Sequence, residues 1–109
     1  MPDLPSHIEV LTLAAIARLG DEPYGVTIRQ EIADCTGRDV SMAAVYAALE
    51  RLELHGLVRP RLSDPLPERG GRARRHYTLT AAGRAFVRRE RANALRMWQG
   101  VPVRGGDGR

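Results

Sequence analysis

Apolar side chains in the first half of the chain repeat with helical spacing, and glycine or proline interrupts the pattern. The spacing predicts a first helix over residues 6–20, which Ser6 or Asp3 can cap and Gly20 can end. Ile8, Leu11, Ala15 and Leu19 form one apolar stripe on it, and Val10, Leu13, Ala14 and Ala17 extend the apolar surface around the side. A helix that is apolar on more than one face is usually buried on more than one. One of these faces is therefore a candidate contact for a second chain.

A second helix is predicted over residues 24–37, after the turn at Pro23. Its apolar residues Ile28, Ile32 and Cys35 follow the i, i+4, i+7 pattern, and a glycine ends it. Free cysteines are commonly buried and inert, so Cys35 is expected to be a small core residue.

A third helix is predicted over residues 42–55, with Ser41 as its N-cap and Gly56 as its end. Its core face consists of Met42, Val45, Ala48, Leu49 and Leu52, and its opposite face of Ala43, Ala44, Tyr46, Ala47, Glu50 and Arg51. Alanine on an outer face removes bulk and lets a helix approach another molecule closely. The alternative is that alanine stands there only as the best helix former.

A hairpin and a fourth helix follow. Strands are predicted over residues 57–62 and 74–80, joined by a loop over 63–73, and Pro60 restricts the first strand to an edge. The second strand places Tyr77 and Leu79 on the core face, and His76, Thr78 and Thr80 on the other face.

Thr80 can cap the fourth helix, which runs over residues 81–99. Its apolar residues are Ala82, Phe86, Val87, Ala94, Met97 and Trp98, while Arg84, Arg88 and Arg91 line a separate face. Residues 100–109 are rich in glycine and are expected to be a flexible tail.

Three helices followed by a two-stranded wing and a last helix is the order of a winged helix-turn-helix, a mainly α fold. We expect residues 1–80 to form this DNA-binding domain and residues 81–99 to form a dimerisation helix. In helix-turn-helix proteins the second helix of the motif lies in the major groove. Here that helix is the one over residues 42–55.

The charge distribution favours a localised surface for a polyanion. The net charge is +4, the pI is near 10.2, and all 17 basic residues are arginine. Residues 1–58 carry four arginines and nine acidic residues, a net charge of −5, whereas residues 59–109 carry thirteen arginines and four acidic residues, a net charge of +9. Genomic base composition explains the absence of lysine but not this asymmetry. Arginine suits phosphate because its planar fork can bond two oxygens at once.

The segment "PERGGRARRHY" over residues 67–77 is interpreted as the tip of the wing. Gly70 and Gly71 permit backbone geometries that bring the chain close to a phosphate surface. Its basic residues, which we expect to contact phosphates or a minor groove, are Arg69, Arg72, Arg74 and Arg75. His76 is expected to add a pH-dependent contact beside them. The alternative interpretation is a solvated charged loop.

Three blocks of sequence resemble the PadR family of bacterial transcriptional regulators, in a short form without an extended C-terminal domain. They are "YGVTIRQEI" (24–32), "SMAAVYAALERLELHGLV" (41–58) and "GGRARRHYTLTAAG" (70–83). The resemblance covers about residues 8–98, and the three blocks in this order are fairly specific. It implies a homodimer that binds operator DNA through two wings and two recognition helices, usually as a repressor.

By position, the resemblance assigns DNA contacts to Ser41, Ala43, Ala44, Tyr46 and Ala47, and we add Arg51 as the only long basic side chain of that helix. Many members of the family continue into a longer helical region used for dimerisation, whereas this chain stops after one helix. Dimerisation is therefore expected to rest on the first and fourth helices, through Ile8, Leu11, Phe86, Ala94, Met97 and Trp98.

Other classes of function have less support. The three histidines lie far apart without metal-ligand spacing to Cys35, and no phosphate-binding motif with lysine is present, so we expect no enzyme, metal or cofactor. The longest apolar run is too short to span a bilayer, and a lone cysteine suits a reducing cytoplasm. Two alternatives stay open: a small aromatic effector bound in a slot near Trp98, and a winged-helix module that binds protein or RNA.

Overall fold

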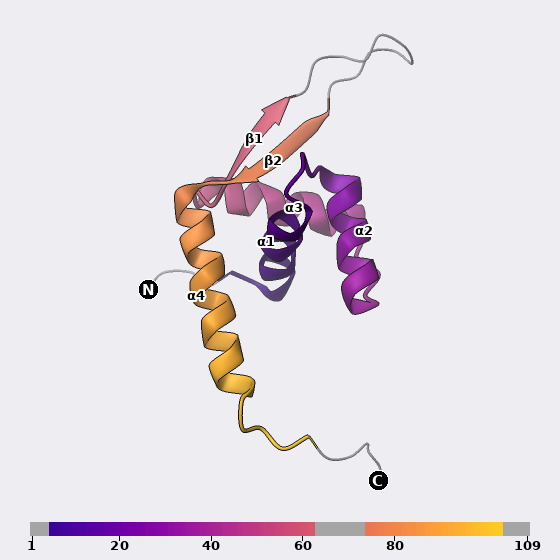
Figure 1. Ribbon diagram of the computed structural model, residues 1–109. Coiled ribbons are helices and arrows are strands. Elements are labelled where there is room, and N and C mark those ends of the chain that lie inside the picture. The colour runs from indigo at the N-terminus through magenta and orange to yellow at the C-terminus, as the bar shows by residue number, and fades with distance from the viewer. Residues whose placement is uncertain (1–4, 63–73, 104–109) are drawn as a thin grey trace.

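The computed structural model describes residues 5–62 and 74–103, which form four helices and a two-stranded antiparallel sheet (Figure 1). The elements are α1 (His7–Leu19), α2 (Gly25–Thr36), α3 (Met42–Leu54), β1 (Val58–Leu62), β2 (Arg75–Leu79) and α4 (Ala81–Trp98). Each predicted element is present, and every bound lies within one residue of its predicted position. The order is that of a winged helix-turn-helix with one further helix.

Polar caps determine where three of the helices begin. Ser6 caps α1 in a reciprocal pair: its hydroxyl accepts from the Glu9 N–H at 3.3 Å, and the Glu9 carboxylate accepts from the Ser6 N–H at 3.2 Å. Ser41 and Thr80 cap α3 and α4, each accepting at 3.0 Å from the N–H three residues further on. These caps were predicted and are confirmed.

The hydrophobic core lies where α1, α2 and α3 meet below the hairpin. α1 lies at the centre of the helices and contacts the other three (Figure 1). The buried apolar residues are Leu13, Ala15, Ile16, Ile28, Ile32, Val45, Ala48, Leu49, Leu52, Val58 and Tyr77. The predicted core face of α3 is confirmed, since four of its five members are buried and Met42 is half-buried. Its burial determines which face of the helix stays exposed.

The base of the hairpin is fastened to the helices on both sides. Pro60 lies on β1 opposite Tyr77 of β2, on an outer strand as predicted. The Tyr77 N–H donates to the Pro23 carbonyl at 3.0 Å, next to a β-bridge between Tyr24 and His76. At the other end, the Thr80 hydroxyl donates to the Gly56 carbonyl at 2.6 Å. The hairpin therefore has a defined direction relative to α3. The predicted loop over residues 63–73 lies outside the described residues.

α4 is packed only along its first half. Phe86 and Val87 lie against the core, whereas every residue from 88 to 100 is exposed. Within the part of the chain that the structure describes, no helix is long and apolar enough to cross a membrane.

Gly83 marks the closest approach between α4 and the segment that leads into β1. Gly83 is buried, and a Cβ atom there would lie 2.0 Å from the carbonyl oxygen of Leu57. This distance is far inside a van der Waals contact, and the opposing atom belongs to the backbone, so a side chain could be fitted only by moving α4 or the segment.

We expect Gly83→Ala to lower the free energy of unfolding by about 2 kcal/mol or more because of this overlap. Helix propensity alone predicts the opposite sign, a gain of about 1 kcal/mol. Urea denaturation followed by circular dichroism measures the difference, with Ala82→Gly at the exposed neighbouring position as the control for propensity. A variant as stable as the wild type would contradict the close approach.

Candidate nucleic-acid interface

The outer face of α3 presents small side chains around one tyrosine. Ala43, Tyr46 and Ala47 are exposed, and Ala44 is half-buried at the start of the helix. Tyr46 retains 52% of its surface. Apart from Tyr46, this part of the helix therefore presents little side-chain bulk to solvent.

Side chains of α3 and of β2 face the same side of the molecule. They line an open groove of about 660 Å³, formed by Tyr46, Glu50, Glu53, Leu54, Arg75 and Tyr77. Arg75 crosses it, donating to the Glu53 carboxylate and to the Tyr77 hydroxyl, both at 3.0 Å. The hydrogen bond to Glu53 raises the pKa of Arg75 above its usual value. Arg75 thus orients β2 relative to α3. Glu53 was not expected at the site, and its partner lies 22 residues away in sequence, out of reach of a local pattern.

Arg51, predicted among the DNA-contacting side chains, forms an ion pair within its own chain. Its Nε donates at 2.9 Å to Oε2 of Glu9, whose residue is only 4% exposed. The same carboxylate caps α1 through Ser6. A carboxylate buried this far needs a charged or hydrogen-bonded partner, and Arg51 supplies one from α3. The guanidinium is therefore directed toward α1.

Of the arginines predicted for the wing, the structure describes Arg74 and Arg75. Arg74 lies with its guanidinium carbon 4.6 Å from the centre of the Tyr24 ring, a cation–π arrangement. Arg69, Gly70, Gly71 and Arg72 lie outside the described residues.

His76 is buried rather than on the outer face of β2, where the alternation predicted it. It is 7% exposed, its Nδ1 donates to the Glu22 carbonyl at 2.8 Å, and its Nε2 lies 3.5 Å from the Glu22 carboxylate. The cause is the turn before α2, which folds over β2 and forms the bridge between Tyr24 and His76. His76 therefore anchors the base of the wing in this structure.

Cys35 is exposed, which corrects the expectation that it lies in the core. Its thiol donates to the Glu31 carboxylate at 3.4 Å. Local desolvation and this hydrogen bond raise the pKa of the Cys35 thiol, which disfavours the reactive thiolate. No group of three or more potential metal ligands occurs among the residues described.

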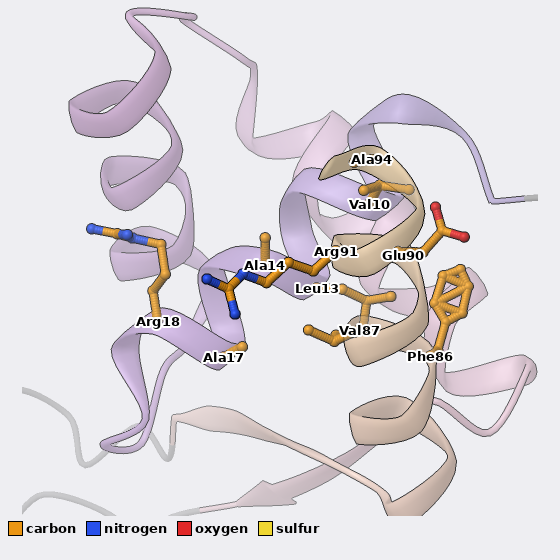
Figure 2. Close-up of a pocket in the computed structure, with 10 residues that line it drawn as sticks. All are labelled: Val10, Leu13, Ala14, Ala17, Arg18, Phe86, Val87, Glu90, Arg91 and Ala94. Atoms are coloured by element: carbon orange, nitrogen blue, oxygen red, sulfur yellow. The ribbon is translucent and has the colours of Figure 1, made fainter. Parts of the chain in front are cut away.

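A second concave surface lies between α1 and α4 (Figure 2), and it is mostly apolar. Its volume is about 410 Å³, and it is lined by Val10, Leu13, Ala14, Ala17, Arg18, Phe86, Val87, Glu90, Arg91 and Ala94. We call it the α1–α4 groove. Phe86 and Ala94, predicted at a dimer interface, line it. Leu11 is half-buried and packs against the core of its own chain, whereas Val10, Ala14 and Ala17 of α1 line the groove.

The apolar end of α4 lies beyond this groove. Leu95, Met97 and Trp98 are 60%, 75% and 73% exposed. Trp98 is not among the residues that line the α1–α4 groove, and the aromatic slot expected beside it in a dimer stays a prediction. Leu95 was missed as a member of this apolar end.

Comparison with known proteins identifies the family to which the chain belongs. A model described as the transcriptional regulator PadR-like family matches residues 13–89. The chain therefore belongs to the PadR-like family of transcriptional regulators, as the three sequence blocks indicated. Members of this family regulate transcription by binding DNA and are not enzymes. No curated protein matches the chain.

Solved structures of PadR regulators share the fold at low identity. The regulator from Clostridium difficile R20291 has a TM-score of 0.64 and 21% identity over 87% of this chain and 100% of that chain. The one from Eggerthella lenta has a TM-score of 0.67 and 23% identity, covering 84% and 77% of the two chains. The PadR-like factor from Bacteroides fragilis has a TM-score of 0.69 and 20% identity, covering 84% of each.

We expect Arg51→Ala to lower the free energy of unfolding by about 1–2 kcal/mol, because it leaves the Glu9 carboxylate buried with less compensation. The affinity of the Arg51→Ala variant for duplex DNA, measured by fluorescence anisotropy, is expected to differ from that of the wild type by less than about threefold. Arg38→Ala, at an exposed position, is the control for removing one positive charge. Unchanged stability together with a large loss of DNA affinity would show that Arg51 acts on DNA.

Proposed function

We propose that this protein is a dimeric, sequence-specific DNA-binding repressor that inserts α3 into the major groove and places its wing along the DNA backbone or minor groove. One observation carries the proposal: Tyr46 on the outer face of α3 and Arg75 of the hairpin line the same groove. A duplex that contacts Tyr46 from this side also reaches Arg75. The family of the chain supports the same reading.

The recognition helix is expected to discriminate bases with few bidentate contacts. Its outer face holds no Asn, Gln or Lys, and Arg51 is held by Glu9. Ser41, Tyr46 and apolar contacts between alanines and thymine methyl groups remain, together with the shape of the DNA. Ala43, Ala44 and Ala47 let the helix axis approach the base edges.

The wing supplies the electrostatic part of binding. Arg74 and the arginines at 69 and 72 are proposed to neutralise phosphates, with Gly70 and Gly71 allowing close approach. Arg75 contributes through its position at the groove, where Glu53 shares its charge. Each neutralised phosphate releases counterions, so affinity falls with salt concentration.

A second copy of the chain is the proposed occupant of the α1–α4 groove. The groove is continuous along α4 with the exposed Leu95, Met97 and Trp98, a run of apolar side chains that one chain leaves in water. Exposed apolar patches of this kind mark interaction sites. Two copies joined by α4 would present two recognition helices, which suits a palindromic operator.

The first test is DNase footprinting on the DNA upstream of the protein's own gene. We expect protection of two half-sites related by a dyad and separated by about one helical turn. We also expect log Kd to rise with log salt with a slope of about 0.9 for each phosphate neutralised. Titration against single-stranded RNA of equal length separates this function from RNA binding. Preference for RNA, or no protection at any duplex, would contradict the proposal.

The dimer has its own test. Ala94→Glu introduces a charge into the α1–α4 groove at a position exposed in the single chain, so we expect a folded monomer by sedimentation equilibrium and operator affinity lowered about tenfold or more. Ala92→Glu, on α4 outside the groove, is the matched control. If Ala94→Glu sediments as the wild type does, α4 does not join two copies through this surface.

A small aromatic effector is a second candidate function. The observation that favours it is the size of the mostly apolar α1–α4 groove, about 410 Å³, which lies in the range of ligand pockets. Titrating the protein–DNA complex with a panel of aromatic compounds tests it. Release of the duplex by one compound, with a change in Trp98 fluorescence, would support it.

A further inference from the structure

Gly25, the first residue of α2, is a glycine that the backbone does not require. Gly25 does not have a positive φ angle, whereas several other glycines of the described residues do. Glycine is also a poor helix former, so its place inside the first turn of α2 needs another cause. Gly25 is buried, and its own surface is therefore closed to a large ligand.

The cause lies in the side chain of Tyr46. A Cβ atom at position 25 would lie 2.7 Å from Cε1 of Tyr46, and 2.9 Å from both its Cζ and its hydroxyl oxygen. Carbon atoms in favourable contact are about 3.5–4.0 Å apart. The phenol end of Tyr46 thus lies over the backbone of Gly25, in the space that a side chain would fill.

Tyr46 is held there without belonging to the core. It is 52% exposed, it lies on the outer face of α3, and it lines the groove between α3 and β2. Within the described ranges, 5–62 and 74–103, its hydroxyl has no hydrogen-bond partner. The structure therefore holds in one orientation a hydroxyl that the fold itself does not use.

We propose that Gly25 is a positioning residue for DNA recognition: by lacking a side chain, it lets the Tyr46 phenol lie against the start of α2, with its hydroxyl ready to bond an acceptor on the duplex. The inference rests on the proposed function of α3. A group already held in its bound orientation loses less conformational freedom on binding. The atoms that a larger residue would meet belong to the far end of a side chain, so a substitution displaces Tyr46 and leaves the fold in place.

The test is a double-mutant cycle on duplex affinity. Wild type, Gly25→Ala, Tyr46→Ala and the double variant are titrated by fluorescence anisotropy against the duplex protected in the footprint and a random duplex of equal length. We expect Gly25→Ala to weaken binding of the protected duplex about tenfold, the size of one lost hydrogen bond to a charged acceptor. In the Tyr46→Ala background the same change is expected to alter affinity less than about twofold, because Gly25 acts through Tyr46.

Tyr46→Phe isolates the hydroxyl, since it keeps the ring over Gly25. It is expected to weaken binding about as much as Gly25→Ala does, and adding Gly25→Ala to it should have little further effect. Equal losses on both duplexes indicate a phosphate acceptor, and a loss on the protected duplex alone indicates a base edge.

Three outcomes would overturn the inference. Unchanged affinity of Gly25→Ala shows that the position of the ring does not matter. An equal loss with and without Tyr46 shows that the added methyl group acts independently of Tyr46. Loss of the folded state in Gly25→Ala, measured by urea denaturation and circular dichroism, shows that the glycine is needed for folding. Failure of the wild type to bind any duplex is a different result and contradicts the proposed function itself.

Discussion

Burial of one side of α3 constrains what the rest of the molecule can present to DNA. Val45, Leu49 and Leu52 are at most 1% exposed, packed against α1 and α2. The orientation of the helix about its own axis is thereby determined, and the opposite side, with Ala43, Tyr46 and Ala47, faces outward. Removing apolar area from water stabilises this arrangement by about 25 cal/mol per Å², so the recognition face is supported by the same contacts that stabilise the fold.

The hairpin depends on that core indirectly, through hydrogen bonds at its base. Pro23 and Glu22 hold one edge of β2, Gly56 accepts from Thr80 at its end, and Glu53 holds Arg75 on the side of α3. These groups come from the turn before α2 and from α3 and the residues just after it. These contacts fix the direction of the hairpin relative to α3.

Local rules explain why the elements were predictable from the sequence. Ser6, Ser41 and Thr80 begin helices because their hydroxyls satisfy backbone N–H groups within three residues, and the apolar spacing of α3 identifies its buried face without any partner in view. Both signals lie within a few residues of the feature that they predict.

The features of the site that the sequence did not reveal arise mostly where distant segments meet. Arg51 is directed by Glu9, 42 residues earlier, and His76 is covered by a turn 54 residues away. Cys35 lies at the end of α2, where the helical spacing still indicates a core position but the exposed last turn leaves the side chain in solvent. The periodicity of a strand (2 residues) or a helix (3.6 residues) does not indicate which distant segment covers a side chain or where a helix leaves the core. The contact between Gly25 and Tyr46 also joins two elements. Its only sign in the sequence is a glycine at the start of a helix.

The capping carboxylate of Glu9 has a consequence for communication across the molecule. Glu9 joins α1 to α3 by accepting from Arg51, and Val10, the adjacent residue, lines the α1–α4 groove. The thirteen residues of α1 thus contact α3 and also line the groove that we propose a second copy of the chain occupies. A displacement of α1 by an occupant of the groove would therefore reach α3 directly, through the apolar packing between the two helices and the Glu9–Arg51 ion pair, with no intervening loop.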